Sequence, residues 1–174
     1  MAKFYITTPI YYINAVPHIG HAYTTIVADV LARWHRLFGD DVFFLTGLDE
    51  NSIKTVEAAR EQGFKDIQAY ADSMAKAWVG AWKLLDISYD DFIRTTQERH
   101  KRNVHELFNR IKERGDIYKG EYEGLYCEGC EAYIAEGDLV DGKCPLHQKK
   151  PKLIKEKNYF FKLSKYRNQI LKHV

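Results

Sequence analysis

The first half of the chain alternates short apolar runs with longer segments whose apolar residues recur at three- and four-residue steps. The run Lys3–Thr8 predicts a strand, and the periodic segment between His21 and Gly39 predicts a helix that the glycine ends. The run Asp41–Thr46 predicts a second, buried strand. A strand, a helix and a strand in this order predict two parallel strands joined by a right-handed crossover.

The remainder of the chain shows two further patterns. Ile53–Gln62 and Asp66–Asp86 are predicted helices, and the second carries its two tryptophans on its apolar side, which favours a core position over a base-stacking role. Gln97–Arg114 is a charged helix that we expect to keep its apolar residues inside. From residue 116, aromatic or aliphatic residues alternate with polar ones and glycines, which predicts short antiparallel strands. We therefore place a subdomain boundary after residue 115.

Composition narrows the class of protein. The 174 residues suffice for one ordinary domain, or for one domain and a fragment. A net charge of +2 is too small to indicate nucleic-acid binding by itself. No leader pattern is present, and no apolar run approaches the roughly twenty residues of a membrane span. The three cysteines are an odd number and lie close together, which argues against disulfides and for a reducing, cytoplasmic location.

Two histidines three residues apart mark the first candidate site. His18 and His21 fall on the first turn of a helix that begins at the carboxyl end of a strand. Unpaired amides and the positive end of the helix dipole favour anions there. Gly20 removes a side chain between the two imidazoles, so a flat group could lie on the backbone. These features predict a cradle for a polyphosphate with an aromatic base stacked at the glycine; the alternative is a pair of polar histidines that cap an ordinary helix.

Asp49 follows the second predicted strand and should lie at the same sheet edge as the histidines. It is therefore placed to meet a cationic or hydroxylated part of the same ligand. The alternative is that Asp49 caps the helix Ile53–Gln62, because aspartate is a good N-cap residue. The residues alone do not decide between these two roles.

A metal site is the second candidate. Cys127 and Cys130 form one C-x2-C pair, and Cys144 and His147 form a C-x2-H pair thirteen residues further on. Two such turns can close a tetrahedron around Zn²⁺, and four protein ligands leave no open position, so the zinc should be structural. The alternatives are unligated thiols or a redox pair, and the latter would need an exposed thiol of low pKa.

The segment from Thr8 to Ala22 carries a family resemblance. His18-Ile19-Gly20-His21 resembles the HIGH signature of class I aminoacyl-tRNA synthetases, and with its flanks it resembles the methionyl-tRNA synthetase family. The resemblance runs through the whole chain. It implies an α/β protein: the first half of a Rossmann-like parallel nucleotide-binding fold in residues 1–115, followed by an incomplete connective-peptide insertion with a small zinc-knuckle β subdomain in residues 116–174.

The resemblance also implies a reaction. Methionine attacks the α-phosphorus of ATP, which is accompanied by Mg²⁺, to give methionyl-adenylate and pyrophosphate, and the methionyl group then passes to tRNA(Met). His18 and His21 would be catalytic and bind the phosphates, and Gly20 would accept the adenine face. Asp49 would hold the methionine ammonium. Ile10 and Tyr12 would line the amino-acid pocket.

The family usually carries Asp-Glu-His-Gly where this chain has Asp49-Glu50-Asn51-Ser52. Asn51 can donate a hydrogen bond but carries no charge.

The run Ile87–Thr96 resembles the third strand of the family and its exit. Arg94, Thr95 and Thr96 fall near that exit, where they could face the ligand, although we favour a role in starting and capping the next helix.

The sequence reaches Val174 without a KMSKS-like loop, a second βαβ half or an anticodon-binding region. We therefore expect a truncated N-terminal part that lacks the C-terminal half of the same fold as its partner. We expect it to activate methionine very slowly or not at all and to self-associate through the open strand edge at Phe4–Thr8. Alternative functions are another class I synthetase, such as the leucine, isoleucine, valine or cysteine enzyme, or a non-catalytic nucleotide- or tRNA-binding module.

Overall fold

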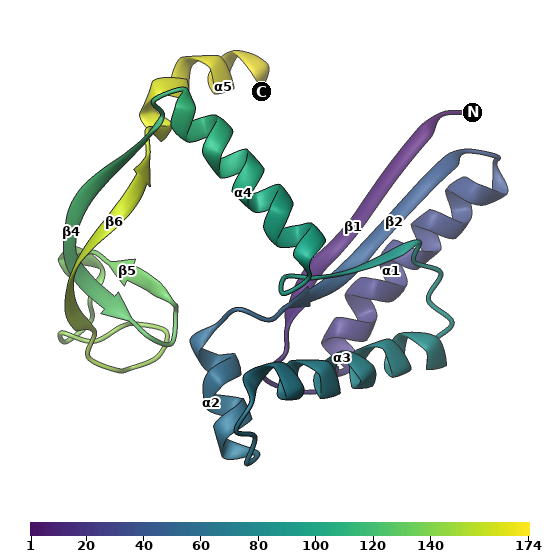
Figure 1. The fold of residues 1–174 in the computed structure, drawn as a ribbon, viewed down its shortest axis with the longest axis horizontal. Helices are drawn as coiled ribbons and strands as arrows, with labels where there is room; N and C mark the ends of the chain where they lie inside the picture. The colour runs from purple at the N-terminus through teal and green to yellow at the C-terminus, as the bar shows by residue number, and fades with distance from the viewer. The chain divides into compact units, whose positions relative to one another are not determined.

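The computed structural model describes all 174 residues and divides them into two compact units, Met1–Val104 and His105–Val174 (Figure 1). The division falls within helix α4 (Glu98–Glu113), whereas the boundary expected from sequence follows the helix. Each unit has its own sheet, so each is described by itself.

A parallel sheet forms the centre of the first unit. Its strands are β1 (Lys3–Tyr12), β2 (Asp41–Asp49) and β3 (Asp91–Arg94), and they pair in the order β1-β2-β3. Both pairings are parallel, and the pairing of β1 with β2 confirms the strand–helix–strand prediction. β1 is longer than expected from sequence, because its pairing with β2 continues beyond an irregularity between Thr7 and Ile10. The carboxyl ends of β1 and β2 therefore finish together.

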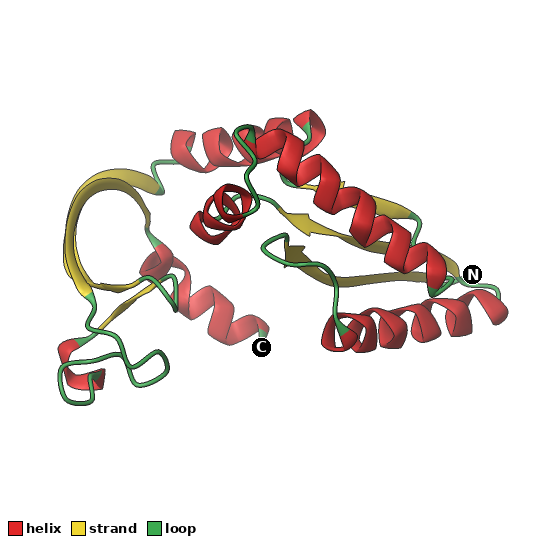
Figure 2. Cartoon of the chain, turned by 90° about the horizontal axis from the view of Figure 1, so that it is seen from below, coloured by secondary structure: helices red, strands yellow, loops and turns green.

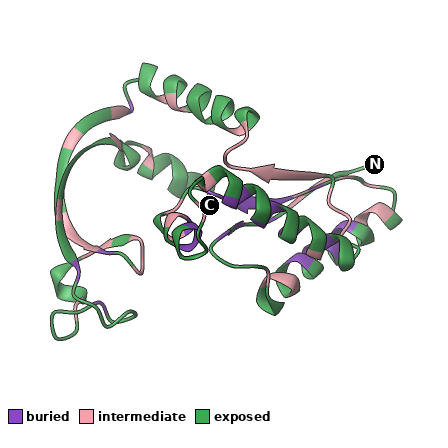
Figure 3. Ribbon diagram, turned by 60° about the horizontal axis from the view of Figure 1, so that its bottom comes forward, coloured by how far each residue is buried: buried purple, intermediate pink, exposed green.

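Helix α3 (Ile67–Leu84) supplies most of the core of the first unit. Trp78 and Trp82 are fully buried, which confirms that they are core residues. They pack with Tyr11 of β1 and Leu48 of β2. A short helix, α2 (Ile53–Glu61), adds two alanines to the same cluster. In Figure 3 the buried residues of this unit lie on the strands and on the helices beside them.

Helix α1 (Ile19–Leu37) follows the predicted segment closely, but its apolar stripe is not its buried side. Trp34 is 58% exposed and Phe38, just after the helix, is 66% exposed. The helix instead packs on Phe44 of β2 through Ala28 and Ala32, and these small side chains let the helix approach the sheet closely. The periodicity thus identified the helix correctly without identifying its packed face.

The second unit is an antiparallel sheet, as expected from its sequence pattern. Strands β4 (Ile117–Cys127), β5 (Ala132–Ile134) and β6 (Lys152–Phe161) pair in the order β5-β4-β6. Figure 2 shows β4 and β6 as a strongly curved pair. The remaining elements are short: η1 (Glu136–Asp138), η2 (Leu163–Tyr166) and α5 (Arg167–His173).

Few side chains of the second unit are buried. Helix α4 has no fully buried residue. Phe108 and Ile111 are only half-buried, and Val104 and Leu107 are exposed, so the expectation that all four apolar residues lie inside is wrong. One buried carboxylate, Asp116, accepts hydrogen bonds from Lys165 Nζ at 2.5 Å and from the Tyr166 hydroxyl. These bonds lower the pKa of Asp116 below its usual value and tie the start of β4 to the end of the chain. A unit with so small a core needs such cross-links.

None of the helices combines the length and the apolar character that crossing a bilayer requires.

We expect alanine replacements of two tryptophans to differ in their effect on stability, because one tryptophan lies in the core and the other at the surface. Trp82→Ala removes a fully buried indole and should lower the free energy of unfolding by about 3–5 kcal/mol. Trp34→Ala, on the exposed side of α1, should change it by less than about 1 kcal/mol. Urea unfolding of the two variants measures both values, and similar losses would contradict this assignment of faces.

Candidate nucleotide site and metal centre

The start of α1 brings the two predicted histidines together. His18 is the N-cap residue, and its Nδ1 atom accepts a hydrogen bond from the amide of Gly20 at 3.1 Å. The Nδ1 atom of His21 accepts one from the amide of His18 at 3.2 Å. This reciprocal pair is a capping box made by two imidazoles. It arises because the first amides of a helix lack backbone acceptors.

The capping box determines which nitrogen of each ring carries the hydrogen. Since Nδ1 accepts from the backbone in both His18 and His21, each neutral imidazole is the Nε2–H tautomer. The rings stack with their centroids 3.7 Å apart and their planes 27° apart. Two parallel rings therefore present two N–H donors at a helix N-terminus, where the helix dipole also favours an anion.

The environment of His21 keeps its ring neutral. The ring lies 5.0 Å from that of Tyr11 and 4.9 Å from that of Trp78, between centroids. Burial, followed by repulsion from His18, lowers the pKa of His21 below 6.5. Protonation would also place a second hydrogen on Nδ1, against the amide that it accepts from. At pH 7 His21 is thus a neutral hydrogen-bond donor.

Gly20 is required at its position for a local reason. A Cβ atom there would lie 3.0 Å from Cε1 of the His18 ring and 3.2 Å from its Nδ1 atom. A side chain would thus crowd this ring, which would have to shift by a few tenths of an ångström. The open backbone that the sequence suggested for a flat group is present, and the histidine ring also depends on it.

Asp49 is the last residue of β2, and it does not cap α2. The N-cap residue is Ser52, whose Oγ accepts from the amide of Thr55 at 3.1 Å. Asp49 Oδ1 accepts instead from the amide of Asn51 at 3.1 Å, which closes the turn after the strand. The alternative role for Asp49 at the helix terminus is therefore wrong.

The strand register decides on which side of the sheet the methionine-site candidates lie. Tyr12 pairs with Asp49, and side chains alternate between faces along a strand. Ile10 and Tyr12 are 41% and 44% exposed, whereas Tyr11 between them is buried and touches the His21 ring. Asp49 thus shares a face with Tyr12, and the histidine lies toward the other face. A ligand that meets both must cross the carboxyl ends of β1 and β2.

The sequence reading missed a buried carboxylate beside Asp49. The Glu50 side chain is fully buried and accepts hydrogen bonds from Arg94 Nε at 2.6 Å and from the Thr96 hydroxyl. The Glu50 amide donates to Thr95 Oγ1 at 2.9 Å, and Arg94 also reaches Asp72 of α3 at 2.6 Å. Arg94, the last residue of β3, and the two threonines after it therefore bind Glu50. The side chains of these residues are used to hold Glu50, a role that the sequence did not predict.

A signal for this network was present in the sequence. A carboxylate followed one parallel strand, and an arginine with two threonines followed the next. Because strand ends of a parallel sheet meet at one edge, groups of opposite charge in these places can be expected to pair.

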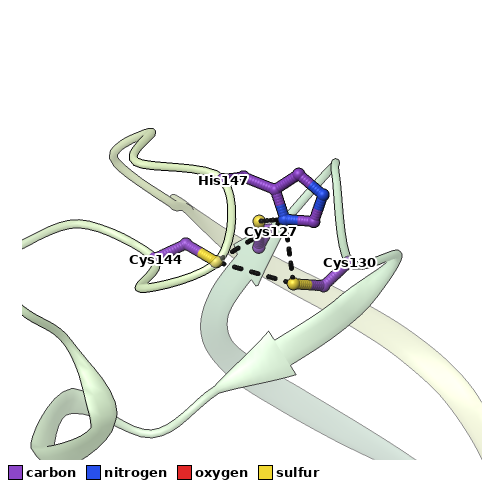
Figure 4. Close-up of side chains that lie close together, drawn as sticks. All are labelled: Cys127, Cys130, Cys144 and His147. Atoms are coloured by element: carbon purple, nitrogen blue, oxygen red, sulfur yellow. Dashed lines mark hydrogen bonds between the residues drawn. The ribbon is translucent and has the colours of Figure 1, made fainter.

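The four predicted metal ligands converge in the second unit (Figure 4). The Nδ1 atom of His147 lies 3.9 Å from the Cys127 sulfur and 3.2 Å from the Cys130 sulfur. The Cys144 sulfur lies 3.7 Å from the same nitrogen and 3.5 Å from the Cys130 sulfur. In a tetrahedron with Zn–S bonds of about 2.3 Å, ligand atoms are roughly 3.5–3.8 Å apart. The spacing fits one shared ion, and it is too wide for a disulfide.

Local backbone and charge also suit a cation. A Cβ atom at Gly129 would lie 2.4 Å from the His147 ring, so only glycine allows the ring to close over the cysteines. Burial alone would raise the pKa of Cys144, but hydrogen bonds from the backbone and ring of His147 lower it to about 6. The hydrogen bond with Cys144 and burial raise the pKa of Cys130 to about 11. A cation would displace the remaining thiol protons.

The geometry defines a class of protein: a parallel α/β unit with an imidazole-capped helix N-terminus at the carboxyl ends of its strands, followed by a Cys3His cluster. The profile of the family described as "tRNA synthetases class I (M)" matches residues 4–150. The chain belongs to this family. The resemblance found in the sequence is thereby confirmed.

Curated relatives and solved structures agree with this assignment. The methionine–tRNA ligase of Streptomyces coelicolor is 48% identical over 179 residues, which cover 98% of this chain and 33% of that protein. That of Thermotoga maritima is 51% identical over 175 residues, covering 98% and 28%. The structure of Mycobacterium tuberculosis methionyl-tRNA synthetase in complex with methionyl-adenylate matches with a TM-score of 0.90 and 39% identity, covering 99% of this chain and 35% of that one. The chain spans about a third of the length of the relatives it matches.

We expect another N-cap residue to replace His18 with little loss of stability, because the helix needs an acceptor at this position and not the imidazole ring itself. His18→Asn keeps an N-cap acceptor and should change the free energy of unfolding by only a few tenths of a kcal/mol, whereas His18→Ala should cost about 1 kcal/mol. Urea unfolding at pH 7.5 measures both. An equal loss in the two variants would show that the imidazole does not act as the cap.

Proposed function

We propose that this chain carries the nucleotide and amino-acid half-sites of a methionine–tRNA ligase. In the reaction, methionine and ATP form methionyl-adenylate and pyrophosphate, and the methionyl group is then transferred to tRNA(Met). The observation that carries the proposal is the imidazole capping box at the start of α1, which presents two Nε2–H donors at the carboxyl edge of a parallel sheet. The curated names of the relatives supply the amino acid.

The proposed first step depends on positioning and charge stabilisation at the phosphates. His18 and His21 donate hydrogen bonds to phosphate oxygens as negative charge develops on the pentacoordinate phosphorus. Amides of the first turn of α1 add further donors. The adenine ring lies against the backbone at Gly20. Mg²⁺ accompanies ATP as part of the substrate.

The proposed amino-acid pocket lies on the opposite face of β1 and β2. Asp49 binds the methionine ammonium, while Ile10 and Tyr12 line the pocket for the side chain. The shared face and partial exposure of these residues support this assignment. The methionine carboxylate then lies over the strand ends, between Asp49 and the histidines. That is the place where it can attack the α-phosphorus of a nucleotide bound at α1.

We further propose that Cys127, Cys130, Cys144 and His147 hold a structural Zn²⁺. The spacing of the four ligand atoms and the glycine under the histidine ring support this ion. When bound, the ion fixes the turn between β4 and β5 to the loop before β6. Such thiolate ligands persist in a reducing compartment, which supports a cytoplasmic location.

Binding of an adenylate analogue tests the proposed substrate. The sulfamoyl analogue of methionyl-adenylate should bind this chain more tightly than the leucyl, isoleucyl, valyl or cysteinyl analogue in titration calorimetry. Asp49→Asn removes the charge that faces the ammonium and should weaken binding by about 10- to 100-fold. The matched control Asp41→Asn changes the exposed first residue of β2 and should have no effect. Equal binding of all the analogues would contradict methionine as the substrate.

Loss of the bound metal should unfold the second unit and leave the first unit folded. In His147→Ala, or after treatment with a strong chelator, we expect zinc content to fall from one ion per chain and the amide signals of residues 116–174 to lose dispersion. The control His105→Ala changes an exposed histidine of α4 and should keep both. Mass spectrometry and heteronuclear NMR measure these outcomes, and an unchanged spectrum after complete zinc removal would refute a structural ion.

A further inference from the structure

Helix α3 reaches the segment that connects β1 to α1. The Tyr70 hydroxyl donates a hydrogen bond to the carbonyl of Ile13 at 2.7 Å, and both groups are buried. Eight residues further along the same helix, Trp78 Nε1 donates to the carbonyl of Ala15 at 3.2 Å. Two side chains of a core helix therefore satisfy two backbone carbonyls of the turn that leads to His18.

Trp78 also contacts the His21 ring directly. Its ring lies 4.9 Å from the His21 ring and stacks on Tyr11 with centroids 5.0 Å apart and planes 16° apart. Trp78 is fully buried, so its position is fixed by packing. Burial also raises the pKa of Tyr70, which keeps its phenol protonated as the donor that Ile13 needs.

We propose that Tyr70 and Trp78 are positioning residues for the nucleotide site, which they hold by fixing residues 13–18 and the His21 imidazole. The inference rests on the proposed function for the identity of the ligand. Neither residue touches the phosphates; each acts through the backbone of the β1–α1 segment, and Trp78 also acts through His21. A donor that must meet a developing charge loses much of its effect when it is displaced by about 1 Å, so this anchoring sets the strength of the site.

The same helix provides a matched control. Trp82 is also fully buried and packs against Trp78 and Tyr11. Its Nε1 atom, however, has no hydrogen-bond partner. A Trp→Phe change removes an indole N–H and some volume at either position. Only at Trp78 does it also release a carbonyl of the β1–α1 segment.

The experiment measures ATP binding by this chain and by Tyr70→Phe, Trp78→Phe and Trp82→Phe, each at a temperature where urea titration shows it to be folded. We expect Tyr70→Phe and Trp78→Phe to raise the dissociation constant of ATP about tenfold, the size of one lost buried hydrogen bond. Trp82→Phe should stay within about twofold of the unchanged chain. Equal weakening in Trp78→Phe and Trp82→Phe, or no weakening in any variant, would overturn the proposal.

A second readout does not depend on the ligand. The pKa of His21 can be followed by NMR of its imidazole in each variant without ATP. Trp78→Phe should raise this pKa toward 6.5, because His21 becomes less buried, while Trp82→Phe should leave it unchanged. If the unchanged chain does not bind ATP, the proposed function fails. A His21 pKa that rises in Trp78→Phe but not in Trp82→Phe would still support the positioning role. The same His21 pKa in both variants would refute that role.

Discussion

Two backbone amides at the start of α1 need acceptors, and the histidine side chains provide them. The amides of His18 and Gly20 lie where a helix offers no carbonyl of its own. Each amide donates its hydrogen bond to an imidazole Nδ1 atom, so the outer nitrogen of each ring becomes the donor. One pair of hydrogen bonds thus starts the helix, orients both rings and selects their tautomers. The two outward N–H donors of the proposed nucleotide site therefore follow from the requirement that this helix be capped.

The core of the first unit holds the segment between β1 and α1 in place. Helix α3 fills the space beside Tyr11 and Leu48 with indole rings, and it also sends hydrogen bonds to the segment before His18. The buried Glu50, just after β2, bonds to Arg94, the last residue of β3, and Arg94 also reaches Asp72 of α3. Both turns that carry candidate site residues are therefore tied to buried side chains. Such anchoring provides the preorganisation that charge stabilisation requires.

The second unit is stabilised in a different way from the first. Its curved strand pair buries few side chains, and its helix α4 buries none, so hydrophobic burial contributes little to its order. Two polar cross-links take that role. Asp116 joins the beginning of β4 to Lys165 and Tyr166, and the Cys3His cluster gathers the opposite end. Four protein ligands would leave no open coordination position on the proposed zinc ion, which suits a structural purpose.

Short-range patterns were sufficient for much of this protein. The three-residue spacing of His18 and His21 and the two close pairs of metal ligands work through neighbouring residues, so their geometry follows from sequence alone. The parallel pairing of β1 with β2 also followed, because crossover handedness leaves few alternatives. Three features depended on contacts between distant segments: the exposed apolar side of α1, the face of the sheet that carries Asp49, and the pairing of Glu50 with Arg94. An apolar periodicity shows that a helix is amphipathic, but only the tertiary structure decides which side meets the sheet, because packing against Phe44 selected the two small alanines over the larger side chains.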